Sequence, residues 1–396
     1  MDVRRRDLVA PALVAGACAL VAGVLGLLTP AFTDYELEAE PSLQALRDGD
    51  WMGFLELAPA YGGSLVLRAP FALLPDLWGG GGDALFRSMA VPCLLAGALL
   101  AVALWRRAGT PLAAWVALVL VAANPLTLRA LEIGHPEELL GGVLCVAAAL
   151  LAARDRAVLA GVVLGLAMAN KPWAVLAVVP LLAILTSGRP RFLLAAGASA
   201  ALVMLPLALA GGAVEEGAAV ARTSGNIFQP WQVWWFLGES GHLVVGTLGE
   251  KPGYRVGPEW LTGMAHPLVV LIPVAISAAL LPKLRHRPWH DGLLLLAFAL
   301  LLRCLLDPWN VSYYSLPFVL ALVAWEVHAD RRPPVLSMAA TFLCWLTLVW
   351  LTTRVHPDVQ AVAYLAWSVP LAALMGARLL GLRQGAAAPA VAPRAI

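Results

Sequence analysis

Long, uninterrupted runs of apolar residues recur along most of the chain. A helix that crosses the hydrocarbon core of a bilayer needs about 20 mostly apolar residues. These runs also lack the two-residue alternation of a membrane β-strand. The pattern therefore predicts an all-α, multi-pass membrane protein. We expect about twelve transmembrane helices, near residues 8–30, 86–105, 111–128, 138–153, 157–170, 172–187, 192–211, 265–282, 291–306, 312–328, 335–352 and 360–380.

The two runs that flank Asn170 and Pro172 are shorter than the others. Each has about 14–15 residues, which gives a helix about 21–23 Å long at the α-helical rise. The hydrocarbon core is about 30 Å thick. The segment 157–187 is therefore either two tilted spans or a re-entrant hairpin.

Basic residues fall in every second short loop between the predicted helices. Lys and Arg concentrate in cytoplasmic loops, so we expect both termini to be cytoplasmic. The clusters are Arg4–Arg6, Arg106–Arg107, Arg154 with Arg156, Arg189 with Arg191, Lys283–Arg287, Arg331–Arg332 and Arg378 with Arg383. The long loops 31–85 and 212–264 then lie on the extracytoplasmic face. We expect one integral-membrane domain over 1–384 and a disordered, Ala/Pro-rich cytoplasmic tail over 385–396.

The first long loop is acidic and contains signals for short helices. Pro41 can open a helix over 42–48, and Asp50 can cap a second one over 51–58. A third apolar stretch, 64–77, contains Arg68, and a full span there would reverse the sidedness of every later basic cluster. We therefore expect helices that lie in the membrane interface rather than across it.

Composition supports this class of protein. Hydrophobic residues make up 61% of the 396 positions and charged residues 13%, whereas a soluble globular protein has about 45–50% and about 25%. Such an apolar chain does not remain disordered in water. The net charge of +2 and the loop-sized basic clusters give no indication of a nucleic-acid partner. The five cysteines lie inside apolar runs and are expected to be small buried hydrophobes.

Two acids just beyond the first helix are candidate catalytic residues. Asp34 and Glu36 are separated by one residue, and such a pair can share a divalent metal or divide the roles of base and orienting group. The alternative is a solvated acidic loop.

Further polar residues lie near the extracytoplasmic ends of predicted helices. Pro136 and the acids after it are ordinary helix-start chemistry, but that does not account for Arg129 or His135. A lysine at membrane depth costs about 2.5–3.5 kcal/mol, so Lys171 either faces a cavity or snorkels to the interface. Arg303 can pair with Asp307. Trp309 and Tyr313 suit sugar stacking or an interfacial aromatic belt.

Four stretches in the first 210 residues resemble a known superfamily. They are Thr33-Asp34-Tyr35-Glu36 after the first helix, Pro59-Ala60-Tyr61-Gly62-Gly63-Ser64, Leu85-Phe86-Arg87-Ser88 with Pro92, and the small-residue helix from Ala160 to Lys171-Pro172. The sequence resembles the GT-C superfamily of integral-membrane glycosyltransferases, and within it the bacterial family 87 type.

The resemblance implies an enzyme that moves a sugar, typically mannose, from a polyprenyl-phosphate donor to an envelope glycolipid or glycan acceptor. In this interpretation Asp34 is the base with Glu36 beside it. The departing polyprenyl phosphate would be stabilised by cations. The candidates for binding the donor phosphate are Arg129, Lys171 and Arg303. The substrate-contact candidates are His135, Glu137, Glu138, Tyr61, Trp309 and Tyr313. No cofactor is assigned, although a divalent metal is compatible with the paired acids.

Two other functions fit the same hydropathy. A twelve-helix transporter or lipid flippase would also explain Lys171, although the two halves of the chain show no matching repeat. A non-catalytic membrane scaffold would need no site.

Overall fold

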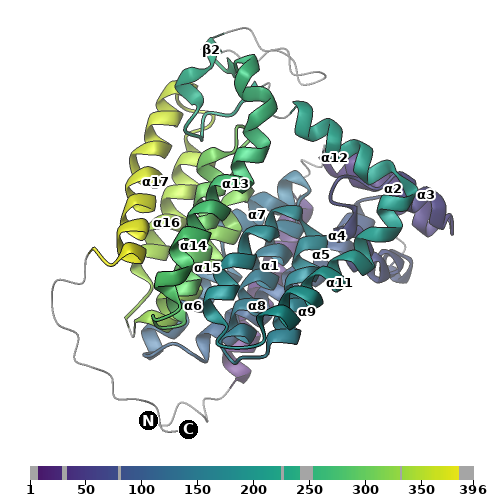
Figure 1. The fold of residues 1–396 in the computed structure, drawn as a ribbon. Helices are drawn as coiled ribbons and strands as arrows, with labels where there is room; N and C mark the ends of the chain where they lie inside the picture. Colours follow the sequence, from purple (N-terminus) through teal and green to yellow (C-terminus); the bar gives the residue numbers. More distant parts are fainter. Residues whose placement is uncertain are drawn as a thin grey trace.

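The computed structural model describes residues 8–28, 34–78, 82–223, 227–240, 253–330 and 332–382. These residues form a bundle of helices (Figure 1). The longer helices are α1 (Val9–Leu28), α5 (Gly82–Trp105), α6 (Pro111–Ala122), α8 (Glu137–Ala152), α9 (Ala157–Asn170), α11 (Arg189–Ala210), α12 (Gly212–Thr223), α13 (Glu259–Leu284), α14 (His290–Leu306), α15 (Leu316–Ala329) and α17 (Pro357–Leu380).

Shorter helical segments connect the long ones. The short α-helices are α2 (Glu40–Arg47), α3 (Trp51–Glu56), α4 (Gly62–Arg68), α7 (Pro125–Ile133), α10 (Val178–Ile184) and α16 (Val335–Trp345). Short 3₁₀ or π segments are η2 (Tyr35–Ala39), η3 (Ala69–Trp78), η4 (Pro172–Ala177), η5 (Trp235–Leu237), η7 (Ser312–Ser315) and η8 (Leu346–Trp350).

The predicted all-α class is confirmed, because each of the twelve predicted ranges contains helix. In the described part of the chain, five segments are long and apolar enough to cross a bilayer: Ala84–Trp105, Pro111–Ile133, Arg189–Ala210, Gly263–Leu284 and Pro357–Leu380. Several other apolar helices are shorter. The count of twelve spans and the cytoplasmic termini stay predictions, and the tail 385–396 lies outside the described residues.

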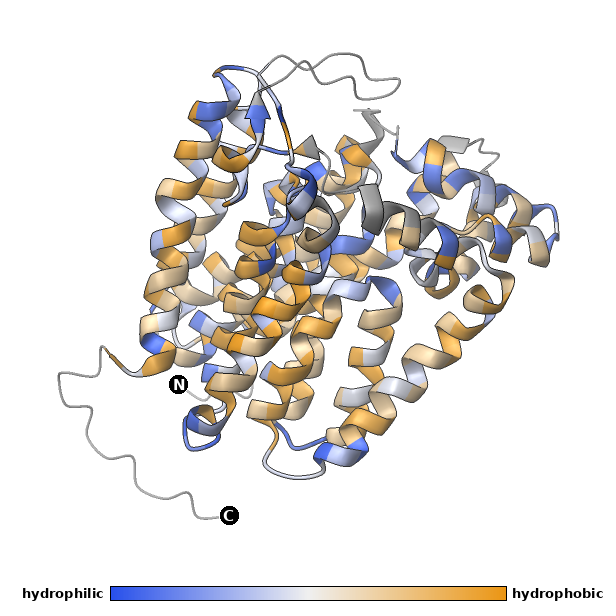
Figure 2. Cartoon of the chain, turned by 45° about the horizontal axis from the view of Figure 1, so that its top comes forward, coloured by the Kyte–Doolittle hydropathy of each residue, from blue (hydrophilic) through white to orange (hydrophobic). Residues whose placement is uncertain are grey.

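Helices α14 and α15 form the centre of the bundle. Nearly every side chain on both is buried, as expected for helices that are apolar on all sides. Outer helices instead present large apolar side chains to the surroundings, including Leu20 on α1 and Leu202 and Leu209 on α11. Figure 2 shows the apolar middle of the bundle between more polar ends. Such an apolar exterior fits contact with lipid.

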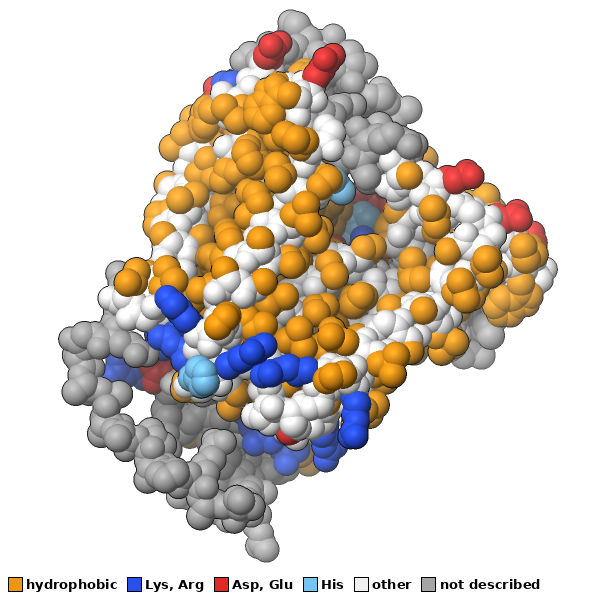
Figure 3. Space-filling view, viewed as in Figure 1, with side chains coloured by type: hydrophobic (Ala, Val, Ile, Leu, Met, Phe, Trp, Pro, Cys, Tyr) orange, Lys and Arg blue, Asp and Glu red, His pale blue; other side chains and the backbone are white. Residues whose placement is uncertain are grey.

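Charged side chains separate between the two ends of the molecule. In Figure 3 most of the visible lysines and arginines lie at the lower end, whereas several acidic side chains lie at the upper end and on the arm at the right. The apolar surface lies between these two ends. This segregation matches the loops on which the sequence placed its basic clusters.

The short helix α9 packs along α11, and η4–α10 returns beside α13 and α14. Asp155, before α9, accepts hydrogen bonds from the backbone N–H groups of Thr186 and Ser187, after α10, so both ends of the pair lie together. Lys171 lies at the opposite turn. A Cβ atom on Gly161 would come within 2.3 Å of the Phe192 carbonyl on α11. Small residues therefore allow close packing here.

The first long loop folds as the predicted set of short helices. The Asp50 side chain accepts a hydrogen bond from the Gly53 N–H at 2.8 Å, which confirms it as the cap of α3. The third stretch forms α4 and η3 rather than one continuous span. Together these segments form the arm at the right of Figure 1.

Part of the second long loop forms a small sheet. Strands β1 (Ile227–Phe228) and β2 (Glu239–Ser240) both pair antiparallel with β3 (Arg255–Val256). Asp358 at the start of α17 accepts hydrogen bonds from the Trp235 indole at 2.8 Å and from Arg255 at 3.3 Å. These bonds fasten the described part of the loop to the helical bundle.

Candidate functional site

A tight turn between α7 and α8 places the first candidate residues together. The turn contains Gly134 at φ +99°, a left-handed conformation that favours glycine. A Cβ atom there would come within 2.9 Å of the Tyr35 backbone nitrogen. The glycine therefore lets the segment that carries Asp34 approach the turn. His135 follows Gly134 and faces Asp34.

A chain of ionisable groups leads from Asp34 into the protein. His135 Nε2 lies 3.2 Å from Asp34 Oδ2, and His135 Nδ1 lies 2.7 Å from Glu137 Oε1. The side chain of Asp34 is 38% exposed, while those of His135 and Glu137 are 5% and 1% exposed. Asp34 is thus the accessible end of the chain.

His135 is held as a cation by this arrangement. Burial alone would lower the pKa of His135, but the charge of Glu137 and the hydrogen bonds to Asp34 and Glu137 raise it to about 9. An imidazolium donates a hydrogen bond from both ring nitrogens. Both ring nitrogens of His135 therefore face carboxylate oxygens, those of Asp34 and Glu137.

Glu137 is the centre of a buried set of ion pairs. Its Oε1 atom lies 3.0 Å from Lys171 Nζ, and its Oε2 atom lies 3.4 Å from an Arg68 nitrogen. Arg68 also donates to the backbone carbonyls of Ser64 and Met89. A buried carboxylate without such partners would carry a large desolvation cost.

Glu138 gathers a second group of partners. The Trp173 indole donates to Glu138 Oε1 at 3.1 Å, and Lys171 Nζ lies 4.0 Å from the same oxygen. Arg303 Nη1 lies 3.5 Å from Glu138 Oε2. The Arg303 guanidinium also lies over the rings of Trp173 and Tyr314, at 4.8 and 4.3 Å from their centroids. The aromatic faces add cation–π attraction to the ion pair.

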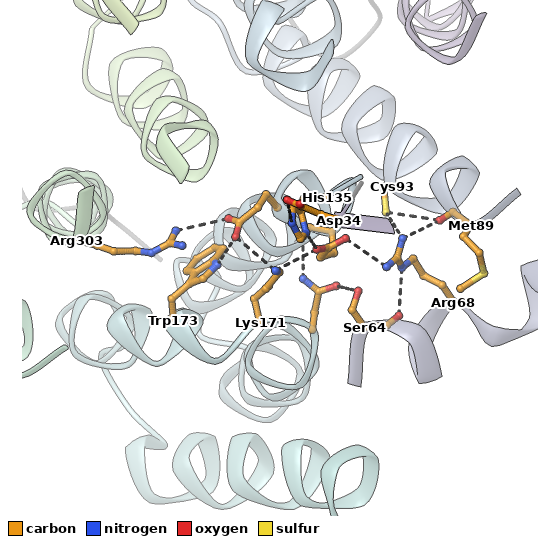
Figure 4. A network of polar contacts seen from close by, with 12 residues as sticks. Asp34, Ser64, Arg68, Met89, Cys93, His135, Lys171, Trp173 and Arg303 are labelled. Atoms are coloured by element: carbon orange, nitrogen blue, oxygen red, sulfur yellow. Dashed lines mark hydrogen bonds and ion pairs between the residues drawn. The ribbon is translucent and has the colours of Figure 1, made fainter. Parts of the chain in front are cut away.

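Backbone and aromatic contacts fix the position of these groups. Asn170 donates to the Glu137 carbonyl at 2.9 Å and accepts from the Ser64 hydroxyl at 2.8 Å. Lys171 Nζ lies 4.0 Å from the centre of the Tyr61 ring. The His135 ring lies 4.7 Å from the Tyr313 ring. Figure 4 shows how the hydrogen bonds and ion pairs join into one continuous network.

We use the name Glu137 network for seven charged residues: Asp34, Arg68, His135, Glu137, Glu138, Lys171 and Arg303. With His135 protonated it has four cations and three carboxylates, and so one net positive charge. In Figure 3 a hollow near the upper end exposes histidine, acidic and basic side chains. A partly buried site with this charge suits an anionic group, because charges interact more strongly there than in water.

The structure brings most of the predicted site residues together. Asp34, His135, Glu137, Glu138, Lys171 and Arg303 belong to the network, and the rings of Tyr61 and Tyr313 border it. Arg303 contacts Glu138 and does not form the alternative ion pair with Asp307, whose Oδ1 accepts from the Trp309 N–H.

Three predicted site residues make no contact with the Glu137 network within the part of the chain that the structure describes. Glu36 is exposed on η2. Arg129 pairs with Glu132 at 2.9 Å on the surface of α7, because the two are one helical turn apart. The Trp309 ring is half-buried and is not among the aromatic groups that border the network. No group of three or more metal-ligating side chains is placed to hold a metal ion within the described residues.

Sequence reasoning missed Arg68, Ser64, Asn170 and Trp173 as members of the site. Arg68 carried a usable signal, because an arginine in an apolar stretch is as costly as the lysine that did receive weight. Its partner could not be read from the sequence, since Glu137 lies 69 residues away. In comparisons with known proteins, no family model and no curated protein matches this chain.

Proposed function

We propose that this chain is a multi-pass membrane glycosyltransferase with both termini in the cytoplasm. It moves a sugar, with mannose as the first candidate, from a polyprenyl-phosphate donor to an envelope glycolipid or glycan. The observation that carries this proposal is a half-exposed carboxylate, Asp34, joined through His135 to a buried network with excess positive charge. The separation of basic and acidic ends (Figure 3) supports transfer at the extracytoplasmic face.

The proposed reaction is a direct displacement at the anomeric carbon. The acceptor hydroxyl oxygen forms the new bond to that carbon while the bond from the carbon to the phosphate oxygen breaks. The hydroxyl proton passes to Asp34, and the bonding electron pair leaves with the polyprenyl phosphate. One displacement inverts the anomeric configuration, so a β-linked donor yields an α-linked product.

The cations of the network have a direct role in this reaction. Lys171 and Arg303 stabilise the negative charge that develops on the departing phosphate. Glu137 and Glu138 hold these two cations in place before substrate arrives. Such preorganised charge requires little rearrangement during the reaction. A good leaving group of this kind needs no general acid.

The test uses purified protein in lipid nanodiscs with radiolabelled polyprenyl-phosphate mannose and an envelope lipid extract. We expect a labelled product from the wild type and a loss of about 10²–10⁴-fold in Asp34→Asn, the range for removing a general base. The matched control is Asp48→Asn, the same substitution at an exposed acid between α2 and α3. Full activity in Asp34→Asn would show that Asp34 is not the base.

The same preparation also tests the transporter alternative. Wild-type protein that forms no labelled product but moves the labelled lipid between the leaflets of a liposome would favour a flippase. Product formed with retained anomeric configuration would instead contradict direct displacement, because that outcome requires two successive inversions.

A further inference from the structure

The helix that carries Asp34 has a second acid on the same face. Asp34 has helical backbone angles and is followed directly by η2. Side chains four residues apart lie on one face of a helix, whereas side chains two residues apart do not. Glu38 therefore lies beside Asp34, and Glu36 is turned away from both. The exposure agrees with this geometry, because Asp34 and Glu38 are half-buried while Glu36 is exposed.

The opposite face of η2 fixes the orientation of this helix. Tyr35 and Ala39, which are also four residues apart, are both buried and pack in one apolar cluster with Leu43 and Phe86. The Tyr35 and Phe86 rings are 4.9 Å apart at their centroids. With these side chains held in the core, the face that carries the two acids is held beside the Glu137 network.

Tyr61 lies between Glu38 and the network. Its ring centre is 4.0 Å from Lys171 Nζ and 5.5 Å from the centre of the His135 ring. Burial and the charges of Glu137 and Glu38 raise the pKa of Tyr61, so its hydroxyl keeps its proton. The hydroxyl is buried and has no hydrogen bond of ordinary length and angle within the described residues. Such a group carries a desolvation cost that a ligand oxygen can remove.

The accessible charges of the site are acidic and the buried ones include its cations. From residue 34 to 40 the chain has four acids and no basic residue. The Asp34 side chain is 38% exposed, whereas those of Lys171 and Arg303 are 12% and 5% exposed. An anionic group that approached η2 would meet like charge first. Uncharged hydroxyl groups would instead find carboxylate oxygens that accept their hydrogen bonds.

The spacing of the two acids suits a pair of hydroxyls. Residues four apart on a helix have Cβ atoms about 5–6 Å apart, and each carboxylate extends beyond its Cβ atom. Asp34 and Glu38 can therefore each accept a hydrogen bond from one of two hydroxyls on neighbouring carbon atoms. Hydrogen bonds to an ionised acceptor are about twice as strong as those between neutral groups.

We propose that Asp34 and Glu38 together bind two neighbouring hydroxyl groups of an uncharged acceptor. The proposal rests on the function proposed above and narrows the acceptor to a carbohydrate or polyol head group. Asp34 faces the hydroxyl that attacks the sugar, and Glu38 accepts a hydrogen bond from the hydroxyl beside it. The Tyr61 hydroxyl donates to an acceptor oxygen at the same place. Glu38, rather than Glu36, is then the second functional acid on this helix.

The first experiment separates acceptor binding from chemistry. The probe acceptor is octyl mannoside, added with the labelled donor to full-length protein in nanodiscs. We expect Glu38→Gln to raise the acceptor KM about tenfold, because it replaces a charge-assisted hydrogen bond by a neutral one. Its kcat should change far less, whereas Asp34→Asn loses kcat. The matched control is Glu56→Gln, at an exposed acid that ends α3 on the same arm.

Each result of this experiment decides between the two acids. An unchanged acceptor KM in Glu38→Gln would overturn the proposal. A KM that rises in Glu36→Gln instead would restore the pair that the sequence suggested. Octyl mannoside that neither accepts sugar nor competes with the envelope acceptor would also overturn the proposal, because two neighbouring hydroxyls would then be insufficient. Thermal unfolding of each variant checks that it is folded.

Deoxy and charged acceptors test the wild type without relying on a variant. Among monodeoxy octyl mannosides, loss of the hydroxyl beside the attacking one should raise the wild-type KM about tenfold. The same loss should leave the KM of Glu38→Gln nearly unchanged, because the two changes remove one interaction. Octyl mannoside 6-phosphate should be a poorer acceptor than octyl mannoside. Equal use of all these acceptors by the wild type would contradict the proposal.

Binding without donor distinguishes this proposal from the proposed function. Saturation-transfer NMR measures octyl mannoside binding to protein in nanodiscs, and Glu38→Gln should bind it more weakly than Glu56→Gln. If binding depends on Glu38 but no sugar is transferred, the glycosyltransferase proposal fails and the hydroxyl site stands. If sugar is transferred and Glu38→Gln changes neither binding nor KM, the hydroxyl site fails and the glycosyltransferase proposal stands.

Discussion

Carboxylates lie near a helix N-terminus at two distant places in this molecule, half-buried at one and fully buried at the other. Near α16, Glu326 accepts hydrogen bonds from the Leu336 and Ser337 N–H groups and from the Ser337 hydroxyl. At the start of α8, Glu137 and Glu138 lie in the first helical turn. Their carboxylates bind cations and an indole that come from other parts of the chain.

The different partners of these carboxylates distinguish a structural helix cap from a candidate functional site. Glu326 satisfies N–H groups that a helix start leaves unpaired, which is the ordinary function of an acid there. The Glu137 network instead holds seven charged side chains in or at the edge of the protein interior. Buried ion pairs often contribute little to stability compared with apolar packing. The network is therefore better explained by binding and chemistry than by folding.

The largest effect is expected from Glu137→Gln. The change leaves Lys171, Arg68 and His135 buried around a neutral group, so we expect a loss of about 3–5 kcal/mol in the free energy of unfolding. Glu326→Gln should cost only about 1–2 kcal/mol, because an amide oxygen can still accept one of the N–H bonds. Denaturant titrations of both variants in the same detergent measure the comparison. Equal losses would show that the two carboxylates have the same structural role.

The second prediction concerns the turn that places Asp34. An alanine at position 134 must adopt φ +99° and meets the Tyr35 backbone. We expect Gly134→Ala to cost about 2–4 kcal/mol, from backbone strain and steric overlap together. Gly211→Ala is the control, since it shares a positive φ of +95° but has no atom near the added Cβ. It should cost only about 1–2 kcal/mol, from strain alone.

A further consequence distinguishes positioning from simple destabilisation. If the turn positions Asp34, the rate of sugar transfer per folded molecule should be lower in Gly134→Ala than in the wild type. Transfer by folded Gly211→Ala should match the wild type. If total activity falls only in proportion to the amount of folded Gly134→Ala protein, the turn supports the fold and does not position Asp34.

Sequence reasoning was most successful where it needed only local patterns. Apolar runs predicted the helices, and Asp50 was found as the cap of α3 because a cap lies next to its helix. The polar candidates Asp34 and Lys171 were chosen for their cost or position, and the only partner considered for Asp34 was the nearby Glu36. Their partners are distant in sequence: Asp34 and His135 are 101 residues apart.

The places where the geometry differs from the sequence-based expectation also have a physical origin. Arg129 was grouped with His135 because both lie near the end of one helix. The α7 helix instead presents Arg129 to Glu132, three residues on, while the Gly134 turn redirects the chain before His135. Arg68 was interpreted only as an obstacle to a span. No local pattern predicts that its guanidinium lies 3.4 Å from the Glu137 carboxylate.

The third prediction concerns pH. The folded-state pKa of His135, about 9, is above its ordinary value of 6.5. Protonated His135 therefore stabilises the fold fully below about pH 6.5, and this contribution is lost as pH rises through 9. We expect the unfolding free energy to fall by at most about 1.4 kcal/mol per pH unit in this window.

The control for this titration is His135→Gln, which should be less stable at pH 7 but should lack the slope between pH 7 and 9. Glu326 and its partners supply no comparable cation, so Glu326→Gln should keep the wild-type slope. A slope that persists in His135→Gln would assign the titration to another group.

The smallest effect is expected from Arg129→Gln. The Arg129–Glu132 pair is partly exposed, with side chains 37% and 29% accessible, and such helix pairs contribute about 0.2–0.5 kcal/mol. We expect the unfolding free energy to change by no more than this amount. If the sequence-based interpretation of Arg129 as a donor-phosphate ligand is correct, the KM for the donor will rise far more than stability falls. If Arg129 only pairs with Glu132 on α7, the changes in donor KM and in unfolding free energy will both be small. The cations that contact the donor phosphate will then be those near the Glu137 network.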